Sequence, residues 1–367
     1  MPSSRHTIRL AACDCLTALG DATTTHAALL REEGALQPVP VLGRAGGDPV
    51  PMALLPGRDL DETSPPAWLK PLLHLLAPVR GAGWGGPLRP VCISSSNFGV
   101  GSLYAFQRDP HPGHLAVGAP HRCVETVCRA LGWGDNIAIF SHACVSAHLA
   151  LAHGSRLLEA GAAETVLVVS FDFLSPFVAG GFHALKILNA RFPAPYQARD
   201  TGAIALGDGA AYAILTADSG DLALVAQSLH NEMHHFTGNR PDGAGFDTTL
   251  APLARSGRRL WLKGHGTGTL EPGRMEAEAF ARHFPGAPLV GWKGALGHTL
   301  GSCGLVELAL AARSLVTGHA PGTVGSAPPT FADNVATTAF STAALDGVVC
   351  ASNAFGGAHA ALLLGHV

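Results

Sequence analysis

One cysteine in the chain has the surroundings of a reactive nucleophile. Cys144 follows the apolar segment 136–140 and precedes the segment 147–160, where apolar residues recur at helical spacing. A thiol at the start of a helix lies near free N–H groups and the positive end of the helix dipole, and both favour the thiolate. A thiolate is a nucleophile, and the acyl thioester that it forms is a good acyl donor. The segment therefore makes Cys144 a candidate nucleophile, although a buried structural cysteine is the more common meaning of such a position.

Two histidines downstream could assist such a nucleophile. His265 follows an apolar segment and lies between two glycines in Lys263-Gly-His-Gly-Thr-Gly-Thr269. His298 ends the motif Lys293-Gly-Ala-Leu-Gly-His298. A single histidine is more often part of a surface or a core, but a strand-end histidine framed by glycines is a better candidate for chemistry. Lys293 could stabilise negative charge or simply extend its ammonium group to solvent, and its local sequence does not decide between these.

The elements expected to position these residues alternate between strands and helices. Short apolar segments predict strands at 8–12, 91–94, 136–140, 165–170, 210–216, 260–263, 289–292 and 347–352. Helical patterns predict helices at 24–33, 69–76, 123–131, 147–160, 275–283 and 304–317. The rest of 35–90 and most of 229–256 are predicted to be loop. This alternation is typical of an α/β fold with covered sheets.

The same pattern occurs twice along the chain. In the first half, a strand ends just before Cys144 and a helix follows. In the second half, the strand 289–292 leads into Lys293 and His298, and another helix follows. Two similar halves that face each other would bring these strand ends to one shared cleft.

Composition excludes several classes of function. The 367 residues carry a formal net charge of −3, so charge gives no argument for binding nucleic acid or an anionic membrane. No 18 apolar residues run together, and Arg5, Arg9 and Asp14 interrupt the first twenty residues where a signal peptide would be apolar. We therefore expect a cytoplasmic protein without membrane insertion. Charged residues make up only 14% of the chain, which favours an oligomer that covers part of its surface.

Metal and phosphate sites have little support in the sequence. None of the eight cysteines forms a C-x-x-C pair, and no phosphate-binding loop motif occurs. His142, His148 and His153 lie near Cys144 without a recognised zinc-ligand spacing, and the adjacent pair His234 and His235 is expected on a loop surface. We predict no metal and no cofactor.

Taken together and in this order, the motifs resemble those of the β-ketoacyl synthases, the elongating condensing enzymes with the thiolase fold. The resemblance covers most of the chain. Its parts are Arg9 to Gly20 for the opening strand, Ala143-Cys144-Val145-Ser146 for the nucleophile, Leu174 to Gly180, Gly207-Asp-Gly-Ala-Ala211, His265-Gly-Thr-Gly-Thr269, Lys293 to His298, Gly301-Ser-Cys-Gly304 with Glu307, and Ser352-Asn-Ala-Phe-Gly-Gly357.

The resemblance implies both a fold and an activity. It implies an α/β thiolase-like fold of two similar βαβαβ halves in five layers, residues 1–215 carrying the nucleophile and residues 216–367 carrying both histidines. It implies an acyltransferase that condenses an acyl group held on Cys144 with malonyl-acyl carrier protein as carbon dioxide leaves, in fatty-acid or polyketide synthesis. Its partners would be acyl carrier protein and a second subunit, in a homodimer or in a heterodimer with another ketosynthase-like subunit.

The resemblance also assigns roles to individual residues. His265 and His298 would support decarboxylation and stabilise the enolate, and Lys293 would hold this pair in place. Thr267 and Thr269 would bind a pantetheine arm. The N–H groups of Cys144 and Phe355 would form an oxyanion hole, with Gly356 and Gly357 completing a glycine-rich loop beside the substrate.

Departures from the family pattern narrow the expectation. Pro272-Gly273-Arg274 stands where the family usually has Gly-Asp, and the chain is short between 42 and 91 and before the nucleophile. The C-terminal glycine-rich loop is also about two residues shorter than the commonest form, which leaves a gating role for Phe355 open. These differences favour a specialised synthase, for example from an aryl-polyene pathway, over a housekeeping one.

Two other functions remain to be weighed against this enzyme. A chain-length-factor-like subunit would pair with an active synthase without catalysis, but such subunits commonly lose the nucleophile, which is present here. A degradative thiolase would need a second catalytic cysteine in the C-terminal glycine-rich loop. Cys350 precedes that loop, in a predicted strand, and the second histidine with its lysine argues against this alternative.

Overall fold

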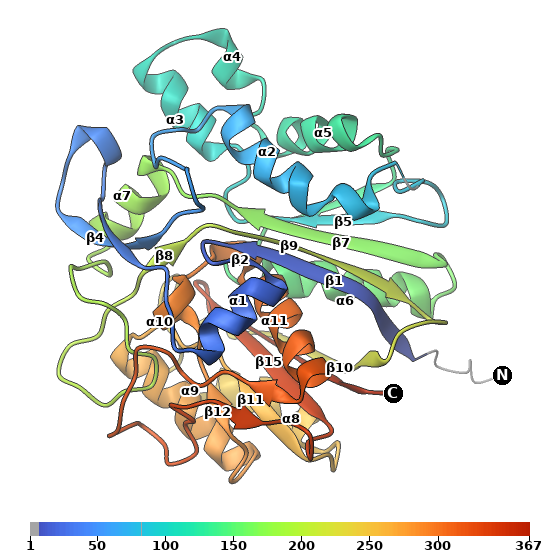
Figure 1. The fold of residues 1–367 in the computed structure, drawn as a ribbon, viewed down its shortest axis with the longest axis vertical. Helices are drawn as coiled ribbons and strands as arrows, with labels where there is room; N and C mark the ends of the chain where they lie inside the picture. Colours follow the sequence, from blue (N-terminus) through green and yellow to red (C-terminus); the bar gives the residue numbers. More distant parts are fainter. Residues whose placement is uncertain (1–6, 82) are drawn as a thin grey trace.

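A central sheet of eleven strands runs through the molecule. The computed structural model describes residues 7–81 and 83–367 (Figure 1). The strand order is β12-β11-β15-β16-β10-β1-β9-β7-β5-β6, with the short β2 paired to β1. These strands are β1 (Ile8–Thr17), β2 (Gly20–Asp21), β5 (Val91–Ser94), β6 (Ile137–Phe140), β7 (Thr165–Asp172), β9 (Gly209–Thr216), β10 (Leu222–Asn231), β11 (Leu260–Lys263), β12 (Leu289–Val290), β15 (Gly347–Ala354) and β16 (Ala358–His366).

The sheet consists of two halves with the same topology. In the first half β5 pairs in parallel with β6 and β7, β7 pairs antiparallel with β9, and β9 antiparallel with β1. The second half repeats these pairings in the same directions. There β11 pairs in parallel with β12 and β15, β15 pairs antiparallel with β16, and β16 antiparallel with β10. The two halves join where Ile8–Leu10 of β1 pairs with Leu222–Leu224 of β10. This repeat confirms the predicted two-fold, thiolase-like organisation, whereas the division into domains at residue 215 stays a prediction.

Helices cover both halves and fill the space between them, giving five layers (Figure 1). On the outside of the first half lie α2 (Pro65–Leu75) and α5 (Pro120–Leu131), and on the outside of the second lie α8 (Ala244–Ala254) and α9 (Leu270–His283). The middle layer contains α6 (Ser146–Glu159) and α11 (Cys303–Thr317), which pack on each other. Helix α6 contacts β5, β7 and β16, and α11 contacts β1, β9 and β15, so both helices touch both halves of the sheet.

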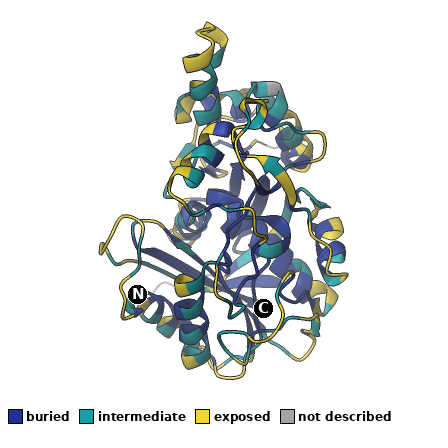
Figure 2. Cartoon of the chain, turned by 90° about the vertical axis from the view of Figure 1, so that its left-hand side faces the viewer, coloured by how far each residue is buried: buried dark blue, intermediate teal, exposed yellow. Residues whose placement is uncertain are grey.

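Smaller elements complete the fold. Helix α1 (Ala22–Leu30) packs on α11, and α3 (Val100–Arg108) packs on α4 (Pro112–Leu115) and α7 (Pro176–Ala184). A second sheet contains β3 (Gln37–Pro40), β4 (Pro49–Ala53) and β8 (Leu206–Gly207), and a third contains β13 (His319–Ala320) and β14 (Phe340–Ser341). The remaining helical pieces are α10 (Lys293–Leu296), η1 (Gly43–Ala45), η2 (Ala77–Val79) and η3 (Leu300–Ser302). Buried residues concentrate in the central strands and helices, and exposed ones in the outer segments (Figure 2).

Several local predictions were wrong. The segment 229–256 is not mostly loop, because it contains the end of β10 and all of α8, whose helical pattern is interrupted by Pro252. The segment 35–90 contains β3 and β4 in addition to the expected helix. We also expect the apolar strand around Val166–Ser170 to lie near a dimer interface, and this stays a prediction. That strand, β7, is buried between β5 and β9, and the strand at this edge of the sheet is β6, where Ile139 is exposed.

One helical stretch has the length and composition of a membrane span. It covers Leu300–Thr317 and so includes α11, and 83% of it is buried inside the fold. Since this stretch packs against both halves of the sheet, its apolar character is that of a central core helix.

Candidate active site

The turn between β6 and α6 presents Cys144. Ala143, just before it, has a positive φ of 44°, which a residue with a side chain adopts only under local constraint. Ser146 supplies that constraint: its hydroxyl accepts the N–H of His142 and donates to the carbonyl of Ala143, both at 2.7 Å. Cys144 is half-buried and lies just before Val145, the residue that caps α6.

Burial opposes the thiolate that the position of Cys144 near a helix was expected to favour. Burial raises the pKa of the Cys144 thiol well above its ordinary value, and the neighbouring Cys303 raises it further. Lys293 and the backbone N–H of Cys144 itself lower it. The expected effect of the helix terminus is therefore outweighed, because removing the thiolate from water costs more than the nearby positive charges return.

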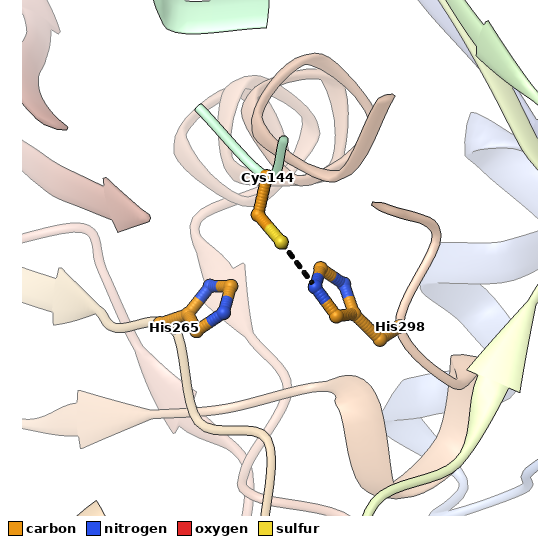
Figure 3. Close-up of side chains that lie close together, drawn as sticks. All are labelled: Cys144, His265 and His298. Atoms are coloured by element: carbon orange, nitrogen blue, oxygen red, sulfur yellow. Dashed lines mark hydrogen bonds between the residues drawn. The ribbon is translucent and has the colours of Figure 1, made fainter. Parts of the chain in front are cut away.

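His298 touches the sulfur directly. Its Nε2 lies 2.9 Å from the Sγ of Cys144 (Figure 3). Its other nitrogen, Nδ1, accepts the N–H of Leu300 at 3.3 Å, and Leu300 adopts a positive φ of 54° there. Because Nδ1 accepts, the proton of the neutral ring is on Nε2, so the ring donates a hydrogen bond toward the sulfur. A thiolate accepts such a bond more strongly than a thiol does.

His265 completes a cluster of three. Its ring meets that of His298 edge to face, with centroids 4.9 Å apart and planes at 88° (Figure 3). Burial lowers the pKa of both histidines well below the ordinary value, and the charge of Lys293 lowers it further. Both rings are therefore neutral at physiological pH. The Nδ1 of His265 is buried and has no hydrogen-bond partner among the described residues.

A buried carboxylate holds the loop that carries His265. Glu276 accepts the N–H of His265 at 2.6 Å and the N–H of Gly266 at 3.0 Å. Tyr196 and Asn353 donate to the same carboxylate at 2.8 and 3.0 Å. Local sequence does not predict a role for Glu276, since its contacts come from three distant segments.

Two buried lysines share one glutamate behind the histidines. Lys293 donates to Glu307 at 2.6 Å and to the carbonyl of His265 at 2.7 Å. Lys263 forms an ion pair with the other oxygen of Glu307 and donates to the carbonyl of Gly264 at 2.8 Å. The side chain of Lys293 therefore does not extend to solvent. The sequence predicts Lys263 only as the last residue of a strand. A lysine directly after the apolar run Leu-Trp-Leu is unusual and is the signal that could have pointed to a buried charge.

The other candidate residues surround this centre. Thr267 and Thr269 hydrogen-bond each other at 2.9 Å. Phe355 lies in the turn between β15 and β16, is 38% exposed and stacks on Phe182 at 6.0 Å between centroids. No backbone carbonyl among the described residues accepts the N–H of Cys144 or of Phe355. Both groups are therefore available to a ligand.

Gly356 and Gly357 shape that turn. They adopt positive φ values of 86° and 72°, and a side chain at Gly357 would press on Glu232. The N–H of Gly356 donates to Phe236 at 2.9 Å, and the carbonyl of Gly357 accepts from Glu232 at 2.8 Å. The turn is thus tied to the segment after β10, and the preceding Ala354 packs with Cys144 and Val145.

Sulfur and nitrogen atoms in this cluster are close enough to share a metal ion. Ligand atoms of Cys144, His265 and His298 all lie within 4.8 Å of one another. However, the N–H of Leu300 occupies Nδ1 of His298, so a metal at Nε2 would face the tautomer that this contact disfavours. His148, which lies near Cys144 in the sequence, is not part of this cluster. It is buried and bonds Ser352 at 3.2 Å, and burial lowers its pKa to about 3. That no metal binds stays a prediction.

Comparisons with known proteins agree with this geometry. Residues 225–326 match the β-ketoacyl synthase C-terminal domain family. The chain is 26% identical over 272 residues to the tetracenomycin polyketide synthase ketoacyl synthase alpha subunit of Streptomyces glaucescens, covering 65% of this chain and 63% of that one. It is 26% identical over 257 residues to 3-oxoacyl-[acyl-carrier-protein] synthase 2 of Vibrio cholerae, covering 63% and 62%. The chain therefore spans less than two thirds of the length of these relatives.

Solved structures match over nearly the whole chain. A β-ketoacyl synthase from Burkholderia phymatum superposes with a TM-score of 0.82 at 19% identity, covering 99% of this chain and 100% of that one. A ketosynthase in complex with its chain length factor from Xenorhabdus doucetiae gives a TM-score of 0.79 at 20% identity, covering 99% and 98%. The topology and these structures define a protein of the thiolase-like fold class. The matching domain and these relatives show that the chain is similar to β-ketoacyl synthases over part of its length.

Proposed function

We propose that the protein is a β-ketoacyl synthase that extends an acyl chain held on Cys144. The observation that carries this proposal is the contact between Cys144 and His298 at 2.9 Å, with the ring of His265 beside it. A nucleophile and two neutral imidazole donors at one point match the needs of acyl transfer followed by enolate formation.

Acyl transfer would use mainly the cysteine and backbone N–H groups. The sulfur of Cys144 attacks the carbonyl carbon of an acyl thioester, and the thiol of the carrier leaves with the proton that Cys144 gives up. The N–H groups of Cys144 and Phe355 would receive the negative oxygen of the tetrahedral adduct. Losing one such donor typically costs about 10²–10³-fold in rate.

Condensation would use the histidines. The carboxylate of a malonyl thioester leaves as carbon dioxide, and the electron pair of the broken C–C bond forms an enolate whose oxygen His265 and His298 stabilise. The enolate carbon then attacks the acyl carbonyl, and Cys144 leaves as a thiolate that takes up a proton. Donors aimed at an oxygen whose charge grows in the transition state accelerate the step.

We assign the remaining roles on the same basis. Thr267 and Thr269 would bind the pantetheine arm of acyl carrier protein, because their hydroxyls lie on the loop that carries His265. Lys293 would keep that loop in place through its bond to the carbonyl of His265.

The assembly and pathway follow the relatives. A type II polyketide ketosynthase is known in complex with its acyl carrier protein, and another in complex with its chain length factor. We infer that this chain accepts acyl and malonyl groups from acyl carrier protein in the cytoplasm and works as a homodimer or with a ketosynthase-like partner. Polyketide relatives support a polyketide-type pathway, of which an aryl polyene is one candidate.

A chain-length-factor-like role without catalysis is the alternative. The presence of Cys144, His265 and His298 in one cluster argues against it. Incubation with acyl-loaded and malonyl-loaded carrier proteins, followed by mass spectrometry, separates the two roles. An enzyme yields the β-ketoacyl carrier and releases carbon dioxide. A non-catalytic subunit yields neither unless an active synthase is added, and that result would reject the proposal.

A further inference from the structure

The chain has four lysines, and two of them, Lys263 and Lys293, are buried on the same carboxylate. Lys263 lies at the end of β11 with its Nζ against Glu307 and 5.9 Å from the centre of the Trp292 ring. Burying a charge is costly unless it is paired and hydrogen-bonded. A second buried ammonium group on one glutamate therefore calls for a role that a neutral side chain would not fill.

The two lysines bond consecutive backbone carbonyls around His265. Lys263 donates to the carbonyl of Gly264 at 2.8 Å, and Lys293 donates to the next carbonyl, that of His265, at 2.7 Å. On the other side of the same segment, Glu276 accepts the N–H groups of His265 and Gly266 at 2.6 and 3.0 Å. Two consecutive carbonyls thus meet ammonium groups, and two consecutive N–H groups meet a carboxylate.

The arrangement is balanced in charge and rigid. Two ammonium groups, Lys263 and Lys293, accompany two carboxylates, Glu276 and Glu307, and all four side chains are buried. Charge-assisted hydrogen bonds of this kind are about twice as strong as neutral ones. Glycines would otherwise leave the segment mobile, since Gly266 has a positive φ of 48° and Gly264 packs against the hydroxyl of Tyr196. The four charges compensate for that freedom.

We infer that Lys263 is a positioning residue for His265, and that it acts on the decarboxylation step and not on acyl transfer to Cys144. This inference rests on the proposed function. Lys263 holds the carbonyl next to His265 and anchors Glu307, which in turn holds Lys293. Acyl transfer does not need the ring of His265, whereas the enolate oxygen does. Misplacing a catalytic group by about 1 Å can cost about 10²-fold in rate.

The charge of Lys263 also acts on the histidines. Burial lowers the pKa of His265 and His298, and Lys293 and then Lys263 lower it further. Removing Lys263 removes a positive charge and leaves Glu307 with one partner, so both changes raise the pKa of the two rings. As the solution is acidified, the two rings of the variant would then become protonated at a higher pH than those of the wild type. The titratable groups that act on this pair or lie beside it are Lys263, Lys293, Glu276, Glu307, Cys144, Cys303 and His148.

The test compares Lys263→Met with Lys263→Gln and with Lys70→Met, a control at an exposed lysine on α2. Two rates are measured from about pH 5 to about pH 9: acyl loading by intact-protein mass, and carbon dioxide release from malonyl carrier protein. Lys263→Met should load acyl groups near the wild-type rate but release carbon dioxide about 10- to 100-fold more slowly. In the plot of its carbon dioxide release against pH, the fall in rate at low pH (the acid limb) should move to higher pH.

The glutamine variant separates the hydrogen bond from the charge. Its amide can still donate to the carbonyl of Gly264, so it should recover part of the decarboxylation rate but keep the shifted acid limb. If Lys263→Met releases carbon dioxide like wild type, or if loading and decarboxylation fall together with no shift in the acid limb, the inference is wrong. If wild type itself neither loads acyl groups nor releases carbon dioxide, the proposed function fails instead.

A measurement on the wild-type protein covers the case in which the variants do not fold. With ¹⁵N-labelled lysine, the signals of the two exposed lysines are assigned with Lys70→Met and Lys186→Met, which leaves the two signals of Lys263 and Lys293. The proposed positioning of His265 requires Lys263 and Lys293 to be charged at neutral pH. Burial lowers the pKa of Lys263 from its ordinary 10.5. Two ammonium signals with slow proton exchange support the inference. A neutral amine at Lys263 would overturn it.

Discussion

The two halves of the sheet place equivalent loops at the site but equip them differently. After β5, the N–H groups of Ser96 and Asn97 donate to the buried carboxylate of Asp172, and after the equivalent strand β11 those of His265 and Gly266 donate to Glu276. The first loop carries two serines, an asparagine and Phe98, and no histidine. The second carries a histidine with two lysines behind it. The same way of holding a loop therefore serves structure in one half and, in our proposal, chemistry in the other.

The next loops differ in a similar way. Five residues connect β6 to α6 and carry Cys144, whereas twelve residues connect the equivalent strand β12 to α11 and carry both Lys293 and His298. Helices α6 and α11 pack on each other, so the starts of both helices meet. In our proposal, the first half thus supplies the nucleophile, and the second half supplies the groups that stabilise negative charge on the malonyl extender.

The largest effect is expected at the nucleophile. Cys144→Ala should abolish acyl loading and lower condensation by roughly 10³-fold or more, because it removes the thiol that contacts His298 and would carry the thioester. The histidines should still release carbon dioxide slowly from malonyl carrier protein. Both products are measured by mass spectrometry. Undiminished loading in this variant would place the nucleophile elsewhere.

Replacing the histidine that touches the sulfur should separate the two steps. His298→Ala should still acquire an acyl group on Cys144, while decarboxylation and condensation fall by about 10²–10³-fold, because one donor to the enolate oxygen is missing. Loading and carbon dioxide release are measured in parallel. Condensation near the wild-type rate would favour the partner-subunit role over the enzyme.

The two carboxylates that hold equivalent loops should respond differently. Glu276→Gln should slow decarboxylation about 10- to 100-fold, since the backbone of His265 loses part of its support. Asp172→Asn should instead lower the free energy of unfolding by about 1–3 kcal/mol, because Asp172 is buried and accepts from Ser95, Ser96 and Asn97. Decarboxylation assays and urea unfolding of both variants test this contrast. Equal effects on decarboxylation would remove the proposed difference between the halves.

A smaller effect concerns stability in acid. His148, between the two halves, has a pKa of about 3 in the folded protein against an ordinary 6.5. The unfolded chain therefore binds a proton that the folded protein does not, and stability falls as the pH drops below about 6.5. His148→Asn should make that fall less steep by up to about 1.4 kcal/mol per pH unit. Urea unfolding at a series of pH values measures it, with the exposed His121→Asn as control, and an unchanged slope would contradict a neutral buried His148.

Local pattern was enough to predict the strands that carry the site. The predicted bounds of β5 and β11 match the structure, since short apolar runs rich in branched and aromatic residues end at clear polar or glycine positions. Helix α6 was predicted within one residue at each end. Helix α8 was missed because glycines and Pro252 obscure its pattern, and its stability comes from packing on β10 and β16.

The support behind the site could not be predicted in the same way. Glu276, Tyr196 and Asn353 meet only because distant segments fold together. The raised pKa of Cys144 likewise follows from burial, which local sequence near a helix start does not reveal. Residue type and spacing predicted which candidate groups lie together, whereas tertiary packing decides their charge and orientation.

Peptide mapping after incubation with an acyl-loaded carrier protein tests the central claim most directly. Cys144 is the half-buried thiol in contact with His298, whereas Cys128 and Cys303 are buried. The account predicts the acyl mass on the peptide that contains Cys144 and on no other. An acyl group found on Cys128 or Cys303, with Cys144 unmodified, would contradict it.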